Sequence, residues 1–267
     1  MTSPRISIQL WTVREELERD TSATLARLSK IGFTTVEAFG FVERADELAA
    51  AFQRHGLRAE TGHASLASDA LNPFEPDAPA PPGLDDVFAA AALLGMTTVI
   101  DPFVDPSRWT TRNDIATTAA RLNAAAVAAA PHGITVGYHN HNHELANIID
   151  GRFALEVFAD YLDPAVILEV DLYWAAAGGA DVPGLIERLG SRVIAVHVKD
   201  GTLTPPPTLR EKPTDQVPAG EGAVPLDDAL DAATSARYAI VEFDAYAGDI
   251  WEGVTKSHDY LVARGLS

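Results

Sequence analysis

The chain has 267 residues, of which 38 are acidic and 20 are basic, so its formal net charge at pH 7 is −18. This charge disfavours nucleic acid and anionic membranes as partners, because phosphate groups are held by clusters of Lys and Arg. The sequence contains no cysteine, which excludes a disulfide framework, a thiol nucleophile and a thiolate metal site. Any metal must therefore be held by oxygen and imidazole ligands.

No segment of the sequence has the pattern of a targeting or membrane segment. Residues 1–5 run directly into an apolar segment without the hydrophobic region of a signal peptide, and no apolar stretch approaches the roughly 20 residues of a membrane span. We expect a soluble, cytoplasmic protein.

Short apolar or β-branched segments alternate along the chain with longer segments rich in Ala, Leu, Glu and Arg. Such alternation is typical of repeated βα units and a parallel sheet. The pattern predicts strands at Ile6–Leu10, Thr35–Phe39, Arg58–His63, Thr97–Asp101, Thr135–His141, Val166–Asp171, Val193–Lys199 and Ala239–Asp244. It predicts helices at Thr21–Ile31, Glu43–His55, Leu84–Leu94, Thr110–Ala130, Gly151–Tyr161, Val182–Leu189, Pro225–Ala233 and Trp251–Arg264.

Eight βα units in a chain of this length favour a single-domain (β/α)8 TIM barrel over residues 1–267. Several predicted helices end in a glycine just before the next strand, as at Gly56 and Gly133, where glycine adopts the left-handed conformation most easily. A doubly wound open sheet is the alternative, but the first βα turn lacks the Gly-x-Gly-x-x-Gly pattern. The proline-containing segments Asn72–Gly83 and Gly201–Gly222 follow strands and would form lids or stiff surface loops on the catalytic face.

Side chains of a barrel strand alternate between the barrel interior and the helix layer. In the last three predicted strands one face is entirely apolar, so this face must pack on the helices. The inward face carries, near its C-terminal end, Asp171, His197, Lys199 and Glu242. Barrel enzymes keep their chemistry at this end of the strands. On the fifth strand the same rule selects Thr135, Gly137, His139 and His141.

Several carboxylates that converge inside a barrel need compensation, because each buried unpaired charge is strongly destabilising. A divalent cation would supply it, and Asp, Glu and His without Cys suit Mn²⁺, Mg²⁺, Co²⁺ or Zn²⁺. We expect one such ion per chain, with Mn²⁺ as the first candidate. The alternative is a metal-free network in which the acids pair with Lys199, Arg192 or Arg210.

With these residues assembled, the chain resembles the xylose-isomerase-like TIM barrels known as sugar phosphate isomerases/epimerases. That group also contains ketose 3-epimerases, inosose dehydratase and endonuclease IV. The resemblance covers nearly the whole chain and rests on segments in a fixed order, which are Gln9-Leu10-Trp11-Thr12-Val13-Arg14, Gly32-Phe33-x-x-Val36-Glu37, Gly137-Tyr138-His139-Asn140-His141, Asp171-Leu172-Tyr173-Trp174, His197-Val198-Lys199-Asp200, Gly220-Glu221-Gly222 and Val241-Glu242. The Tyr-His-Asn-His segment is similar to that of one subgroup.

The resemblance implies a metal held by Glu, Asp, His and Glu from four consecutive late strands. Asp171, His197 and Glu242 match three of these ligands. Many epimerases carry Glu where this chain has His139, whereas the subgroup has its acid a few residues later, here at Glu144. We expect Glu144 to be the fourth ligand, with His139 as the alternative. The departure weakens any expectation of the two-Glu mechanism of ordinary ketose epimerisation.

The expected catalytic residues are those that would serve an enediolate mechanism. A metal that chelates a ketone oxygen and its neighbouring hydroxyl stabilises the enediolate, and a nearby base removes the proton. Glu242 is the expected base, and His141 the opposing acid or base. Glu144 and Lys199 complete the set, Lys199 through contact with a hydroxyl or oxyanion, with a structural salt bridge as its alternative role.

Substrate contacts are expected from residues at strand ends or in the loops that follow them, which are Trp11, Glu37, His63, His139, His143 and Trp174. The two tryptophans would stack on the apolar face of a sugar ring. Packing at the barrel rim is the alternative for Glu37 and His63, and solvent exposure is the alternative for His143.

Together these features favour a divalent-metal-dependent isomerase or epimerase of a keto-sugar or polyol. A second hypothesis is a lyase on the same scaffold, which dehydrates a keto-polyol or eliminates from a 3-keto-glycoside. A third is a barrel that binds sugar without catalysis. Phosphate on the substrate is disfavoured, because the last two loops offer no Gly-rich cradle beyond Gly220-Glu221-Gly222. The resemblance also implies a homo-oligomer, a dimer or tetramer.

Overall fold

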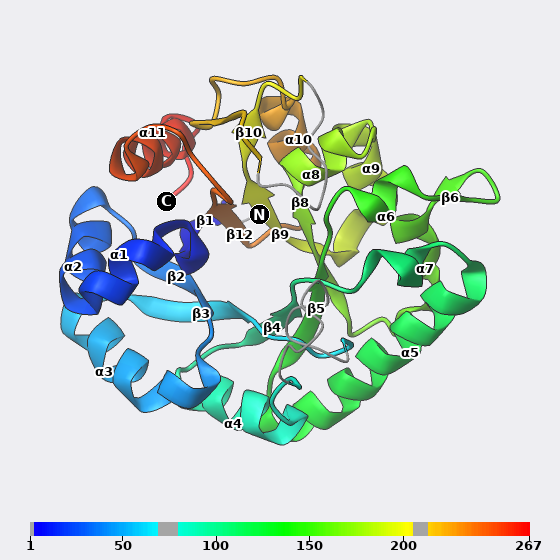
Figure 1. The fold of residues 1–267 in the computed structure, drawn as a ribbon, viewed down its shortest axis with the longest axis horizontal. Helices are drawn as coiled ribbons and strands as arrows, with labels where there is room; N and C mark the ends of the chain where they lie inside the picture. The colour runs from blue at the N-terminus through cyan, green and yellow to red at the C-terminus, as the bar shows by residue number, and fades with distance from the viewer. Residues whose placement is uncertain (1–2, 69–79, 205–212) are drawn as a thin grey trace.

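The computed structural model describes residues 3–68, 80–204 and 213–267. At its centre is a closed barrel of parallel strands in the order β1-β12-β9-β8-β5-β4-β3-β2, which confirms the predicted (β/α)8 barrel (Figure 1). The barrel strands are β1 (Arg5–Gln9), β2 (Thr35–Phe39), β3 (Arg58–His63), β4 (Thr98–Asp101), β5 (Thr135–His139), β8 (Ile167–Asp171), β9 (Val193–Val198) and β12 (Tyr238–Val241).

Helices form an outer ring around this barrel (Figure 1). The α-helices are α1 (Arg14–Arg19), α2 (Thr21–Ile31), α3 (Ala45–His55), α4 (Leu84–Leu93), α5 (Arg112–Ala129), α6 (His143–Ala146), α7 (Ala154–Tyr161), α8 (Leu172–Ala177), α9 (Val182–Leu189), α10 (Leu226–Ala232) and α11 (Ile250–Ala263). Short 3-10 segments are η1 (Leu10–Val13), η2 (Val42–Arg44), η3 (Pro106–Trp109), η4 (Ala130–His132) and η5 (Gly190–Arg192). Within the described ranges, no helix is long and apolar enough to cross a membrane.

Two small antiparallel hairpins interrupt the βα pattern. One pairs β10 (Asp200–Gly201) with β11 (Gln216–Val217), and the other pairs β6 (Ile148–Ile149) with β7 (Arg152–Phe153). The turn of the second hairpin has positive φ at Asp150 (51°) and Gly151 (81°), a conformation that a helix cannot contain. The helix predicted at Gly151–Tyr161 is therefore wrong over its first three residues.

Besides the first strand, which ends at Gln9 instead of Leu10, three barrel strands end earlier than the sequence pattern predicts. The fifth ends at His139, the seventh at Val198 and the eighth at Val241. Beyond these points the backbone bonds to side chains; Phe243 N–H, for example, donates to Thr12 Oγ1 at 3.1 Å. Consequently His141, Lys199 and Glu242 belong to the first residues after the strands, at the C-terminal mouth of the barrel.

The core lies on both sides of the strands. Outward-facing side chains such as Leu168, Val170 and Val196 are buried in one large cluster with the helices. Inside the barrel, at its lower end, Ala195, Tyr238 and Ile240 form a separate small cluster. These three apolar side chains lie on the N-terminal side of the polar residues, which therefore face the C-terminal mouth of the barrel.

Parts of the two predicted lid segments, residues 72–79 of the first and 205–212 of the second, lie outside the described residues. The described remainder of the second is fixed by the buried carboxylate of Asp200. It accepts backbone N–H groups from Gly201 at 2.9 Å, Gly220 and Gly222 at 3.0 Å and Val224 at 3.1 Å. Four backbone donors on one carboxylate hold this stretch in a single conformation.

Candidate metal centre and active site

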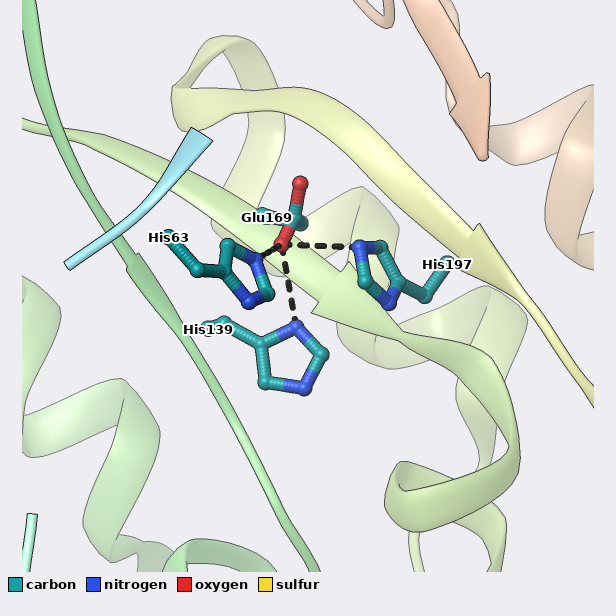
Figure 2. Close-up of side chains that lie close together, drawn as sticks. All are labelled: His63, His139, Glu169 and His197. Atoms are coloured by element: carbon teal, nitrogen blue, oxygen red, sulfur yellow. Dashed lines mark hydrogen bonds and ion pairs between the residues drawn. The ribbon is translucent and has the colours of Figure 1, made fainter. Parts of the chain in front are cut away.

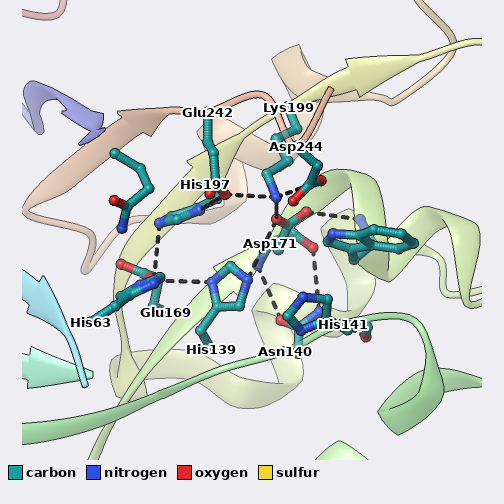
Figure 3. Close-up of polar contacts among 12 residues, drawn as sticks. His63, His139, Asn140, His141, Glu169, Asp171, His197, Lys199, Glu242 and Asp244 are labelled. Carbon is teal, nitrogen blue, oxygen red and sulfur yellow. Dashed lines mark hydrogen bonds and ion pairs between the residues drawn. The ribbon is translucent and has the colours of Figure 1, made fainter. Parts of the chain in front are cut away.

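Strand β8 supplies two inward-facing carboxylates, Glu169 and Asp171, which are both buried. Strand register fixes their neighbours, because Glu169 lies level with His139 on β5 and Asp171 level with His197 on β9. The two carboxylates and two imidazoles therefore meet inside the barrel mouth (Figure 3). Asn140 ties the two strand ends together, since its Oδ1 accepts the Asp171 N–H at 3.1 Å.

The two oxygens of Asp171 face different surroundings. Oδ1 accepts the backbone N–H of Trp174 at 2.8 Å and thereby caps the N-terminus of α8. Oδ2 is buried and has no hydrogen bond of good geometry, although Lys199 Nζ lies 2.9 Å away and His139 Nε2 3.7 Å away. Burial raises the pKa of Asp171 to about 6. Oδ1 thus caps helix α8, whereas Oδ2 is directed toward Lys199 and His139.

His197 joins two groups of carboxylates. Its Nδ1 lies 2.6 Å from Glu242 Oε2, and its Nε2 lies 2.8 Å from Glu37 Oε1 and 3.0 Å from Glu169 Oε2. Burial alone would lower the pKa of His197, but these three carboxylates outweigh it and raise the pKa well above its usual value. The ring is fully buried, so its orientation is set by these contacts.

Glu37 and His63 lie deeper in the barrel, beside Glu169. His63 Nε2 is 3.0 Å from Glu37 Oε1 and 2.8 Å from Glu169 Oε2, and Gln9 Nε2 donates to Glu37 Oε1 at 2.9 Å. Burial opposes the charged form of His63, but Glu37 and Glu169 outweigh it and raise its pKa to about 10. Both residues were expected to contact substrate; His63 lines the cavity, whereas Glu37 is fully buried beneath it.

Lys199 is almost completely buried, yet its ammonium meets three carboxylates. Nζ lies 2.6 Å from Glu242 Oε2, 2.9 Å from Asp171 Oδ2 and 3.0 Å from Asp244 Oδ2. Burial acts to lower the pKa of Lys199, but the carboxylates raise it well above its usual value. The converse holds for Glu242: burial raises its pKa, while Lys199 and His197 outweigh burial and lower the pKa well below its usual value.

Two overlapping groups of buried side chains have the composition and spacing to hold a metal ion. The first is His139, Asp171, His197 and Glu242, and the second is His63, His139, Glu169 and His197; in each group the ligand atoms lie within 4.8 Å of one another. The first group fits a divalent cation well, because it combines oxygen and imidazole ligands and contains Asp171 Oδ2, which has no hydrogen bond of good geometry. Figure 3 shows its members facing one another.

The structure does not bring Glu144, the expected fourth ligand, into either group. Glu144 Oε1 accepts the Tyr138 hydroxyl at 2.6 Å, and Oε2 accepts the His141 N–H at 3.0 Å. Burial raises the pKa of Glu144 to about 8. Its place among the potential ligands is taken by the alternative, His139. The carboxylate of Glu144 instead shapes the loop that carries His141.

His143 was expected to contact substrate, with solvent exposure as the alternative; it is not exposed, and it is not among the described residues that line the cavity. The ring is buried, its Nε2 is 3.2 Å from the Val104 carbonyl oxygen, and burial lowers its pKa to about 3. Trp174 is also buried, only 3% exposed, and is absent from the residues that line the cavity. It packs against His141 with ring centroids 5.5 Å apart, so it supports the wall from behind.

A cavity of about 540 Å³ lies over the metal-ligand group. Its lining combines polar and apolar side chains, which are Gln9, Trp11, Phe39, His63, Ala64, Ser65, Pro102, Phe103, His139, His141, Lys199, Glu242 and Asp244. Trp11 stands at the mouth, 42% exposed, with Phe39 against its edge and the Arg14 guanidinium over its ring at 4.4 Å. An amphipathic cavity of this kind suits a small carbohydrate.

His139 and His141 are neutral imidazoles in this cavity. Burial lowers the pKa of each well below its usual value, and neighbouring histidines and Lys199 lower it further. His141 Nδ1 is buried without a hydrogen-bond partner. A neutral imidazole that lines a cavity has one nitrogen that can accept a proton and one that can donate a proton to a bound molecule.

Three residues of this arrangement were absent from the expected site, namely Gln9, Glu169 and Asp244. Because side chains alternate along a strand, Glu169 is predicted on the same face as Asp171, and Asp244 on the same face as Glu242. The sequence therefore contained an indication of the inward placement of both residues. What was missing was the register between strands, which sets Glu169 level with His139. Gln9 lies level with Glu37 in the same way.

Comparisons with known proteins agree with this fold. The model of the family described as xylose isomerase-like TIM barrel matches residues 25–259. A sugar phosphate isomerase/epimerase from Parabacteroides distasonis is 22% identical, with a TM-score of 0.79 over 98% of this chain and 95% of that chain. The probable 3-DHS dehydratase AsbF from Bacillus anthracis is 14% identical, with a TM-score of 0.71 over 97% of this chain and 98% of that chain.

A third solved structure, the IolI protein with a zinc atom, is 15% identical, with a TM-score of 0.72 over 97% of each chain. At these identities the likeness to solved structures concerns the fold alone. None of the curated proteins matches this sequence.

Proposed function

Because the chain belongs to the xylose isomerase-like TIM barrel family, we propose that it is a divalent-metal-dependent isomerase or epimerase of a keto-sugar or polyol. The observation that carries the proposal is the buried group of His139, Asp171, His197 and Glu242 beside a carbohydrate-sized cavity. A divalent cation held by these residues would polarise a sugar carbonyl and stabilise the negative charge that develops when the neighbouring carbon loses a proton.

The side chains of the cavity supply two groups that can move a proton. Glu242 stays ionised at neutral pH, because Lys199 and His197 lower its pKa despite burial, and an ionised carboxylate can accept a proton. His141 lines the cavity, and burial lowers the pKa of its imidazole well below the usual value, so the ring is neutral. The two residues follow β12 and β5, which are separated in the barrel by β9 and β8. A substrate between them could lose a proton to one residue and regain it from the other.

The residues at the cavity support an unphosphorylated substrate. Lys199 is the one Lys or Arg among the described residues that line the cavity, and its ammonium already lies between three carboxylates. A phosphate group would meet the carboxylates of Glu242 and Asp244, and the described lining residues offer no further Lys or Arg to hold it. The exposed face of Trp11 offers a surface on which the apolar face of a sugar ring can stack.

A second candidate, a lyase, is favoured by one feature. Where a two-carboxylate mechanism would need its second acid, this cavity presents the imidazole of His141. If the leaving group is on the carbon next to the one that loses its proton, His141 would assist its departure instead of returning a proton to carbon. The product would then be a dehydrated or cleaved sugar.

The experiment is incubation of the purified protein with a panel of keto-sugars in D₂O, with Mn²⁺ or with EDTA, followed by NMR of the recovered sugars. We expect one divalent ion per chain by elemental analysis and metal-dependent deuterium incorporation that Glu242→Gln reduces by about 100-fold or more, the scale of a lost general base. Glu252→Gln, on the exposed face of α11, is the matched control and should leave the rate unchanged. Dehydrated or cleaved products would favour the lyase. Absence of metal, exchange and product would leave a sugar-binding barrel.

A further inference from the structure

One oxygen of Glu169 lies at the centre of three imidazoles (Figure 2). Oε2 is 2.8 Å from His63 Nε2, 3.0 Å from His139 Nδ1 and 3.0 Å from His197 Nε2. The carboxylate is buried, so water cannot replace these contacts. Three ring nitrogens, from β3, β5 and β9, thus take their orientation from one acceptor on β8.

These contacts determine which nitrogen of each ring faces the cavity. A carboxylate can only accept, so the His139 nitrogen that faces Glu169 must carry the ring proton. This is Nδ1, and the unprotonated Nε2 of His139 is then the atom directed toward Asp171 Oδ2, 3.7 Å away. In His197, Nε2 faces Glu37 and Glu169, so Nδ1 is the atom beside Glu242. The two nitrogens left over both point to the carboxylates of the candidate metal group.

We propose that Glu169 is a positioning residue that holds His139 and His197 in the tautomers and orientations with which they ligate a divalent cation. The inference rests on the proposed function, because it concerns the same metal group. Carboxylates that accept the second N–H of a ligating histidine are a recurring element of metal sites, and their loss weakens metal binding by about 10- to 100-fold. Here one carboxylate serves two ligands at once, with Glu37 as a second acceptor for His197.

An ion coordinated by Glu169 itself, among His63, His139 and His197, is the competing arrangement. The hydrogen bonds argue for positioning: His63 and His139 each donate to Glu169, and His197 Nε2 and Gln9 donate to Glu37, so each of these N–H groups has an acceptor. An ion placed among them would have to displace three of these protons, whereas an ion in the first group would displace one, between His197 Nδ1 and Glu242 Oε2, which are 2.6 Å apart. Each group contains a buried carboxylate oxygen without a hydrogen bond, Asp171 Oδ2 in the first and Glu169 Oε1 in the second, so the hydrogen bonds distinguish the two arrangements.

The test compares Mn²⁺ affinity, by calorimetric titration of the metal-free full chain, in wild type, Glu169→Leu and Glu169→Gln. Leu removes the acceptor and should weaken binding by about 10- to 100-fold with one site retained. Gln keeps an acceptor oxygen and should lose much less. Glu60→Leu is the matched control. Glu60 is also a carboxylate on a barrel strand, β3, but it accepts hydrogen bonds from Tyr238 and Arg5 at the opposite, N-terminal end of the barrel. It should leave the affinity unchanged.

Long-range ¹H–¹⁵N spectra of the metal-free protein provide a second readout that needs no bound ion. Wild-type His139 should carry its proton on Nδ1, and Glu169→Gln should keep it there. A proton on Nε2, or wild-type affinity in a folded Glu169→Leu, would overturn the inference while leaving the proposed function intact. Loss of all binding in both Glu169 variants would show that Glu169 is a ligand. A wild-type protein that binds no divalent ion would overturn both proposals together.

Discussion

Replacement of Lys199 by Met tests whether its buried ammonium is what holds the acids of the barrel mouth together. Met has nearly the same length but no charge, so the change removes the cation and preserves most of the packing. Three carboxylates, those of Asp171, Glu242 and Asp244, would lose a partner that lies 2.6–3.0 Å away. Two of them, Asp171 and Glu242, have almost no contact with solvent to compensate.

The expected loss in the free energy of unfolding can be estimated from the attraction that is removed and from the cost of protonating a carboxyl group instead. At an effective dielectric constant of about 20, each pair at 3 Å contributes about 5 kcal/mol of attraction before desolvation is counted. The variant can escape the repulsion by protonating one carboxyl group, which at pH 7.5 costs about 5 kcal/mol for a group with an ordinary pKa of about 3.9. Removal of one partner of a buried ion pair costs about 3–5 kcal/mol. We therefore expect Lys199→Met to lower the free energy of unfolding by about 3–5 kcal/mol.

The assay is urea unfolding followed by circular dichroism at pH 7.5 in EDTA, with Lys256→Met as the control. Lys256 also bridges two carboxylates, Glu221 at 3.2 Å and Glu252 at 3.0 Å, but its side chain is 45% exposed. Such a surface bridge is worth about 0–1 kcal/mol. Without Lys199 the acids have raised pKa values in the folded state, so the deficit of the variant should shrink as the pH falls toward 5. A loss below about 1 kcal/mol, or one that grows on acidification, would refute the reasoning.

Two further predictions concern the loop that carries His141. Burial raises the pKa of Glu144 to about 8, so the protonated carboxyl group favours folding below its unfolded pKa of about 4.5, and this contribution is lost as the pH rises toward 8. In urea unfolding between pH 5 and 8, the Glu144→Gln variant should therefore gain stability relative to wild type as the pH rises. A difference in stability that stays constant over this range would contradict the raised pKa. A Cβ on Gly178 would lie 2.6 Å from the backbone oxygen of Asn142, so Gly178→Ala should cost about 1–3 kcal/mol, as overpacking does, and unchanged thermal stability would show that the loop moves freely.

Alternation along the strands predicted the main features of the barrel mouth. Because the outward faces of the last strands are apolar, the inward placement of Asp171 and His197 followed without knowledge of any neighbour. The same rule placed Glu169 inward, but a contact with three histidines depends on the register of four strands. Register is set by the packing of whole helices and loops, which no local pattern contains.

The placements of Glu144 and Trp174 away from the expected site share a physical cause, which is an unpredicted short helix soon after a strand. α6 begins at His143 and turns Glu144 back toward Tyr138, away from the metal group. α8 begins at Leu172, capped by Asp171, and buries Trp174 behind the cavity wall. Helices of four to six residues are too short for an apolar period to appear in the sequence, so side chains within them could not be oriented beforehand.

Asp171 both caps helix α8 and belongs to the candidate metal group. These two roles affect how substitutions at this position are to be interpreted. Asn caps a helix about as well as Asp, and Ser or Thr does so adequately, so the fold alone selects for a small polar residue at this position. A homologue that had lost its catalytic role would still be expected to carry one of these residues. An aspartate at 171 is therefore weak evidence of activity when the sequence is compared with others, and Asp171→Asn, which keeps the cap, separates chemistry from folding where Asp171→Ala would confound them.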